Sequence, residues 1–180
     1  MNLIWRIILT YIFARFEKTQ GILEPSYLKL RVLPTDADFL WHLNNGRYLS
    51  LLDLARIKYL ITTNSLKKIK RLGVYPVVAS ETIRFKKSID MFKQFEIKTQ
   101  LVGWDDKFFY IHHTLYCNNE LCAMAGIKVC YIKKRQGLVN THDIVDALGL
   151  PAVSPVLPTW VIEWNTADQA LYESSIMQNV

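Results

Sequence analysis

The chain has 180 residues, of which 51% are hydrophobic and 21% are charged, and its formal net charge is +6. This length suits one domain with a substantial core, and the composition excludes a disordered or collagen-like chain. The three cysteines are odd in number and lack metal-ligand spacing. That argues against a disulfide scaffold and favours a reducing compartment, so we expect a cytoplasmic protein.

The charge is divided unevenly along the chain. All 22 Lys and Arg residues lie at or before Arg135, whereas the last 45 residues hold five acidic residues and no basic one. The first 135 residues, with 22 bases and 11 acids, therefore carry +11, and the remainder carries −5. A positive body suits nucleic acid, an anionic membrane or a phosphate-bearing ligand. Because no nucleic-acid-reading motif accompanies it, we expect no nucleic-acid partner.

Residues 1–20 predict an amphipathic helix with a narrow polar side that includes Arg6 and Thr10. The opposite side is apolar and consists of Leu3, Ile4, Ile7, Ile8, Tyr11 and Ile12. The segment is too short for a membrane span and is interrupted by Arg6. Two interpretations remain open. Residues 1–16 make peripheral contact with a membrane, or the helix packs its apolar side on its own domain or on a partner chain.

Residues 21–150 predict one α+β domain. Alternating residues predict a strand over 26–33, and apolar residues at helical spacing predict a long helix from Asn45 to about Thr62. Asn44 or Asn45 is expected to cap this helix. Short turns separate further strand-like stretches, which predicts antiparallel pairing. The strand-like stretches cover residues 74–87, 95–104, 108–117 and 120–134. Two short helices are predicted over residues 65–72 and 141–148.

Residues 151–180 form a C-terminal extension with three prolines and two tryptophans. Large aromatic side chains gain much from burial. We therefore expect Trp160 and Trp164 to dock the extension against the domain.

Glycine and histidine spacing excludes several common kinds of site. No two of the seven glycines are closer than the eleven residues between Gly126 and Gly137. This removes G-x-G-x-x-G, the P-loop and G-x-S-x-G. His112 and His113 would point to opposite faces of a strand, which makes them a poor metal pair. We expect no metal and no organic cofactor.

Within the segment 34–56, PTDADFLWHLNNGRYLSLLDLAR, the ten positions 36–45 hold two carboxylates, a histidine and two asparagines just before and at the start of the long helix. A helix N-terminus offers N–H groups to an oxyanion, and a carboxylate beside it can act as general base or nucleophile. Alternatively, Asp36, Asp38 and the asparagines only cap the helix and shape a turn.

The string DADFLWHLNNGRYL resembles the D-x-D-x-x-G-H-V-N-N-x-x-Y signature of hotdog-fold acyl-CoA thioesterases of the 4-hydroxybenzoyl-CoA thioesterase-like group. HLNNGRYL and the following DLAR are most similar to thioesterase superfamily member 6-like proteins. The resemblance covers about residues 26–135. It implies a hotdog fold, in which an antiparallel sheet wraps around a long central helix, here with an extra N-terminal helix and C-terminal tail. It also implies a homodimer or tetramer with sites at subunit interfaces.

The resemblance assigns the catalytic carboxylate to Asp38 and an oxyanion-binding role to the helix start at Asn45. The other positions that it implies would bind substrate: Asp36, Trp41, His42, Asn44, Tyr48, Arg84 and Lys86. Arg84 and Lys86 would bind the phosphates of CoA. Alternatively, their positive charges only form a solvated strand edge that discourages aggregation.

The implied activity is hydrolysis of acyl-CoA or acyl-carrier-protein thioesters. Trp41 stands where the family usually has glycine, and this departure predicts a remodelled pocket with weak or lost activity. The alternative is a non-catalytic acyl- or lipid-binding hotdog protein held at a membrane, which Trp41 and the apolar N-terminus both favour.

Overall fold

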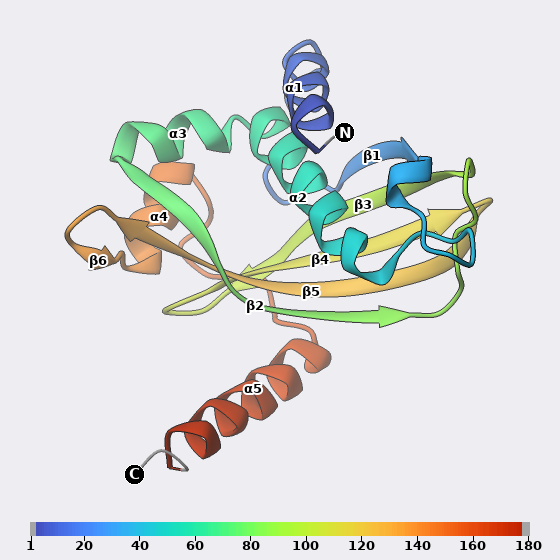
Figure 1. Ribbon diagram of the computed structural model, residues 1–180. Helices are drawn as coiled ribbons and strands as arrows, with labels where there is room; N and C mark the ends of the chain where they lie inside the picture. The colour runs from blue at the N-terminus through green and yellow to red at the C-terminus, as the bar shows by residue number, and fades with distance from the viewer. Residues whose placement is uncertain (1–2, 178–180) are drawn as a thin grey trace.

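The alternating segments of the sequence form one curved, six-stranded antiparallel sheet in the computed structural model, which describes residues 3–177 (Figure 1). The strand order is β1-β3-β4-β5-β2, with the short β6 beside β5. The strands are β1 (Ser26–Arg31), β2 (Val74–Phe85), β3 (Gln94–Trp104), β4 (Phe109–Cys117), β5 (Glu120–Lys133) and β6 (Gly137–Leu138). The tight turns between β3, β4 and β5 make these three strands neighbours, as predicted, whereas β2 lies on the far side of β5.

Five α-helices accompany the sheet: α1 (Leu3–Ala14), α2 (Asn45–Thr62), α3 (Ser65–Leu72), α4 (Thr141–Leu148) and α5 (Thr159–Met177). The bounds of α2, α3 and α4 confirm the sequence prediction. Asn44 caps α2, since its side-chain oxygen accepts a hydrogen bond from the Gly46 N–H at 2.9 Å. Gly73 ends α3 with a φ of +69°, a left-handed conformation that glycine adopts without strain.

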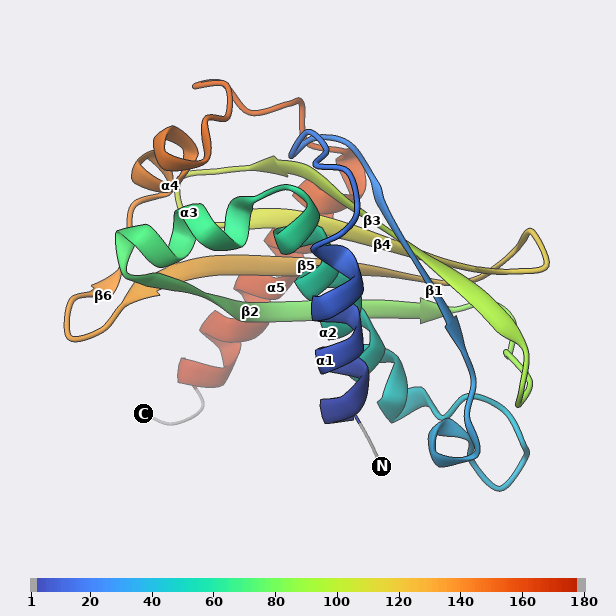
Figure 2. The same ribbon diagram turned by 90° about the horizontal axis from the view of Figure 1, so that it is seen from above.

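The long helix α2 lies in the concave face of the sheet, α1 lies on the side of α2 that faces away from the sheet, and α3 lies beside the end of α2 (Figures 1 and 2). It is enclosed so completely that only Asp53 is well exposed between Tyr48 and Thr62. Its apolar residues join the main core, which explains why the sequence shows apolar positions all around this helix. This arrangement is the one predicted from the resemblance to hotdog proteins.

The N-terminal segment forms the predicted helix, but it packs on α2 with its mixed side rather than its apolar side. Thr10 and Ala14 are buried, and Arg6 reaches a buried carboxylate. Ile4, Ile8 and Ile12 remain 71%, 40% and 44% exposed. The predicted apolar side is therefore divided: Leu3 and Ile7 pack against the core, and its isoleucines at 4, 8 and 12 are not covered by the rest of residues 3–177.

Across residues 3–177, no helix combines the length and hydrophobicity needed to cross a bilayer.

The C-terminal extension docks against the sheet, but as a 19-residue helix, α5, where the sequence predicted only a tail. Figure 1 shows α5 on the side of the sheet opposite α2. Trp160 packs on β4 and β5: its ring lies 5.2 Å from that of His112 and covers Gly126. Lys128, only 2% exposed, pairs with Asp168 of α5 at 2.6 Å and lies 4.7 Å from the Trp164 ring.

The contact between Trp160 and Gly126 gives a test of this docking. A β-carbon at position 126 would lie 2.7 Å from the Trp160 ring, which is too close without displacement of α5. We expect Gly126→Ala to lower the free energy of unfolding by about 1–3 kcal/mol in urea denaturation followed by circular dichroism. At Gly21 the new β-carbon would meet only the Glu24 side chain, at 3.4 Å. Equal stability of Gly126→Ala and Gly21→Ala would contradict the docking.

Candidate active site

Residues 37–43 form a closed turn immediately before α2. Ala37 bridges Leu43, and the Asp38 N–H donates to the His42 carbonyl at 2.9 Å. The turn is also held by the segment before β3, because Leu43 N–H donates to the Ile89 carbonyl and Met91 N–H to the Trp41 carbonyl, both at 2.8 Å. Backbone bonds on both sides therefore fix the position of Asp38.

The Asp38 side chain is half-buried, and its two oxygens have different surroundings. Oδ1 accepts hydrogen bonds from the Leu40 N–H at 2.9 Å and the His42 N–H at 3.3 Å. Oδ2 has no hydrogen-bond partner within residues 3–177. One oxygen thus holds the carboxylate in place, while the other is available to water or a ligand.

A cavity of about 220 Å³ adjoins Asp38 and the start of α2. Its lining brings together five of the residues predicted for the site with four others: Asp38, His42, Leu43, Asn45, Tyr48, Phe85, Lys86, Lys87 and Ser88. The resemblance therefore selected residues from two separate segments, the turn with the start of α2 and the end of β2, and the structure brings these residues together around one cavity. The sequence motif does not include Leu43, Phe85 or Ser88. Phe85 could have been identified from the alternation of side chains along the strand, because it shares the side of the strand that faces α2.

The first turn of α2 leaves one backbone donor unused. The Gly46 N–H is taken by the Asn44 side chain and the Arg47 N–H by the Asn44 carbonyl, both at 2.9 Å. The Asn45 N–H has no acceptor among the described residues. Because Asn45 lines the cavity, this N–H and the positive end of the helix dipole can meet a carbonyl oxygen there.

Tyr48 forms one wall of the cavity, one turn into α2. Its ring meets Phe85 edge-on, with 4.9 Å between the ring centroids. Burial, with smaller contributions from Cys122 and Cys117, raises the pKa of Tyr48 to about 12. The hydroxyl is therefore protonated at neutral pH and has no hydrogen-bond partner within residues 3–177, so it can donate to a ligand.

Asp36, the first aspartate of the D-x-D sequence, does not line this cavity. It is buried, and its carboxylate pairs with Arg6 at 2.8 Å and with Arg47 at 3.8 Å. The same carboxylate accepts the Leu33 N–H at 3.0 Å, and the Asp36 carbonyl accepts the Asn44 N–H at 2.9 Å. These bonds make Asp36 a link between α1, the turn and the cap of α2.

Trp41 and Arg84 also lie outside the cavity lining. Trp41 has a φ of +63°, and its ring is 65% exposed. On β2, Glu81 faces α2, since it pairs with Arg56 at 3.1 Å, whereas Ser80 faces α5 and bonds Asp168 at 2.8 Å. Arg84 shares the side of Ser80, because side chains alternate along a strand.

Two remaining polar groups border the site. The His42 Nε2 atom lies 3.5 Å from an Asp90 carboxylate oxygen. No group of three or more His, Cys, Asp or Glu side chains within residues 3–177 is arranged to hold a metal ion.

Comparison with known proteins places this site in context. The family model for the thioesterase-like superfamily matches residues 32–164. Protein THEM6 of Xenopus laevis is 33% identical over 155 residues, which cover 82% of this chain and 73% of that protein. The solved structure of a probable thioesterase from Escherichia coli has a TM-score of 0.62 at 21% identity, covering 69% of this chain and 95% of that one.

A second solved structure, of a 4-hydroxybenzoyl-CoA thioesterase mutant complexed with 4-hydroxybenzoyl-CoA, has a TM-score of 0.61 at 15% identity. It covers 69% of this chain and 98% of that one. These matches confirm the predicted hotdog fold and the resemblance on which it was based.

The backbone of Trp41 gives a test of the turn. A β-carbon is strained at this positive φ, so glycine should be favoured here over alanine. We expect Trp41→Gly to be more stable than Trp41→Ala by about 0.5–1 kcal/mol in urea denaturation. Phe39 of the same turn is also exposed but has an ordinary φ, so there the order of Gly and Ala should reverse. The same order at both positions would rule out the turn described.

Proposed function

Because the chain belongs to the thioesterase-like superfamily, we propose that it hydrolyses acyl-CoA or acyl-carrier-protein thioesters in the cavity beside Asp38. One observation supports this proposal above the others. A carboxylate oxygen of Asp38 and the backbone N–H of Asn45, both without partners in the described chain, belong to the lining of the same cavity. Acyl transfer to water requires a general base and a hydrogen-bond donor for the oxyanion in the same cavity.

The reaction would proceed by attack of water on the thioester carbonyl carbon. Asp38 Oδ2 takes a proton from the water as the new C–O bond forms. The Asn45 N–H, together with the dipole of α2, stabilises the negative charge that develops on the carbonyl oxygen. The C–S bond then breaks, and the proton held by Asp38 passes to the departing thiolate. In the second variant of this mechanism, Asp38 attacks the carbonyl carbon directly and water hydrolyses the resulting anhydride.

Lys86 would bind the phosphate groups of CoA at the edge of the cavity. It lines the cavity, and its backbone N–H donates to the Cys122 carbonyl at 2.8 Å, which fixes the chain as it leaves β2. It has no carboxylate partner among the described residues, whereas the neighbouring Lys87 is paired with Glu120. A lysine without a counter-ion is the better phosphate ligand of the two.

A second copy of the chain would complete the site by pairing along β2. This strand is 12 residues long and borders only β5, so its other edge is unpaired within the described chain. Tyr75 and Val78 are 47% and 38% exposed on it. The adjoining turn exposes Phe39, Leu40 and Trp41 by 88%, 57% and 65%. A long edge strand with exposed apolar residues is a surface that proteins normally cover.

Replacement of the catalytic carboxylate tests the reaction. Asp38→Asn keeps the shape of the side chain and its bonds to the turn but removes the base. We expect it to lower kcat by about 10²–10⁴-fold on acyl-CoA, measured as thiol release across a panel of acyl chains. Asp106→Asn, the same change in an exposed turn, is the control and should leave kcat unchanged. Equal rates for both variants would refute the role of Asp38.

The same panel separates hydrolysis from the second candidate function, acyl or lipid binding without catalysis. The exposed aromatic ring at Trp41, in place of the usual glycine, is the observation that favours this candidate. If the protein binds acyl-CoA tightly and releases no thiol with any member of the panel, the binding function is correct.

Subunit pairing is tested by a charge on the free edge of β2. We expect the unmodified protein to have the mass of a dimer in light scattering and Val78→Lys to have the mass of a monomer, because paired edges would bring two new ammonium groups together. Turnover should fall with dissociation if the partner completes the site. Val156→Lys, at a position 96% exposed in the C-terminal extension, is the matched control. An unmodified protein that is monomeric at assay concentrations would exclude this interface.

A further inference from the structure

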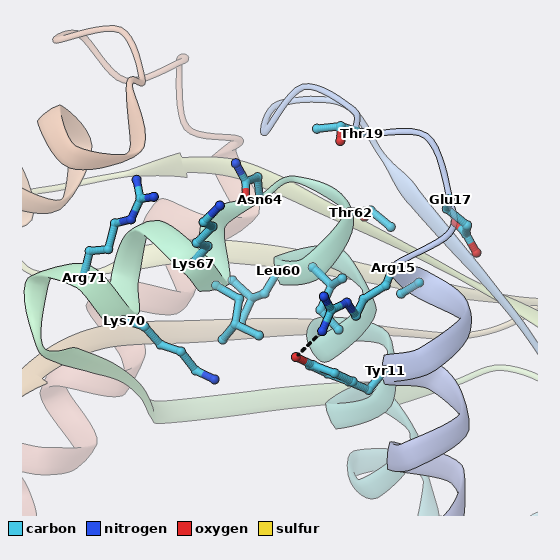
Figure 3. Close-up of a pocket in the computed structure, with 13 residues that line it drawn as sticks. Tyr11, Arg15, Glu17, Thr19, Leu60, Thr62, Asn64, Lys67, Lys70 and Arg71 are labelled. Atoms are coloured by element: carbon cyan, nitrogen blue, oxygen red, sulfur yellow. Dashed lines mark hydrogen bonds between the residues drawn. The ribbon is translucent and has the colours of Figure 1, made fainter.

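A cleft of about 610 Å³ lies between α1 and α3, far from the cavity at Asp38 (Figure 3). Its walls come from the second half of α1, the end of α2 and α3. Figures 1 and 2 show α1 on the side of α2 that faces away from the sheet, and α3 beside the end of α2. No residue of this cleft lines the candidate active site.

The cleft carries four cations: Arg15, Lys67, Lys70 and Arg71. None of them pairs with a carboxylate within residues 3–177, and the one acidic residue in the lining, Glu17, is already paired with Lys58 at 2.6 Å. In Figure 3, Arg15 and Lys70 extend into the space from opposite sides, and Arg15 contacts the Tyr11 hydroxyl at 3.4 Å. Such a group of like charges without counter-ions favours an anionic ligand.

The same helix that forms one wall of the cleft exposes large apolar side chains. Trp5, Phe13 and Phe16 of this segment are 59%, 64% and 85% exposed. The isoleucines at positions 4, 8 and 12 are exposed as well. Apolar and aromatic residues beside lysine and arginine are the combination by which helices bind in the plane of an anionic bilayer. A soluble anion would account for the cations alone and would leave the apolar residues in water.

We propose that α1 and the α1–α3 cleft form a docking surface for an anionic lipid bilayer. The exposed apolar residues of α1, and Phe16 just after it, enter the interface, and the cleft cations receive the negatively charged lipid headgroups. The acidic residues of α5 fit this orientation, because α5 lies on the opposite side of the sheet, away from the bilayer (Figure 1). The docking does not depend on the hydrolytic activity proposed above.

Vesicle flotation with the full chain tests the surface. The unmodified protein should float with vesicles of phosphatidylcholine and phosphatidylserine, and much less with phosphatidylcholine alone. The triple variant Lys67→Gln/Lys70→Gln/Arg71→Gln should bind the mixed vesicles about a hundredfold more weakly, from the loss of three charges near the surface. The control Lys93→Gln/Lys107→Gln/Lys134→Gln removes the same charge from loops between strands and should change binding by less than about threefold.

A second variant tests the apolar half of the surface. Phe13→Ser/Phe16→Ser should weaken flotation by at least about tenfold. Three results would overturn the proposal. The first is no flotation of the unmodified protein with mixed vesicles, and the second is an equal loss of vesicle binding in the cleft variant and the loop control. The third is a Phe13→Ser/Phe16→Ser variant that floats normally but no longer self-associates. Turnover of soluble acyl-CoA by the cleft variant should be unchanged, so failure of docking is distinguishable from failure of the proposed hydrolysis.

Discussion

Burial of α2 in the concave face of the sheet is the interaction on which the rest of this structure depends. Each large apolar side chain removed from water stabilises the fold by roughly 1.5–3 kcal/mol, and α2 contributes residues such as Leu51, Leu52 and Leu54 to the centre of the core. The helix cannot slide or rotate without exposing them. Its N-terminus is therefore fixed beside the end of β2, and this places the Asn45 N–H and the Asp38 turn at one cavity.

The elements that the sequence predicted well are those whose residue pattern is decided locally. Alternation within β3 and β4, and the cap and stop residues around α2 and α3, need no knowledge of distant contacts. The side on which α1 packs is different, because apolar residues occur around most of that helix and the choice depends on the distant partner of Arg6. Helix α5 was missed because its contacts to Gly126 and Lys128 lie on a surface that the sequence does not reveal.

The candidate site was predicted in part for the same reason. The motif identified the turn and the helix start correctly as neighbours, since they are adjacent in the chain. It assigned Asp36 to substrate binding, whereas tertiary ion pairs with Arg6 and Arg47 bury Asp36 outside the cavity lining. It also could not give the direction of the Trp41 ring, which depends on a positive φ, or the side of β2 on which Arg84 lies.

The ion pair between Arg6 and Asp36 means that α1 supports the turn as well as presenting a surface. If proteolysis removed α1, the buried Asp36 carboxylate would keep only Arg47, at 3.8 Å, as a cation. Removing one partner of a buried ion pair typically costs about 3–5 kcal/mol, and the strain would fall on the segment whose carbonyl holds the Asn44 N–H. A single cut after α1 would therefore loosen the turn beside the cavity and the cap of α2, as well as remove the exposed side of α1, so the remaining domain would not keep its structure intact.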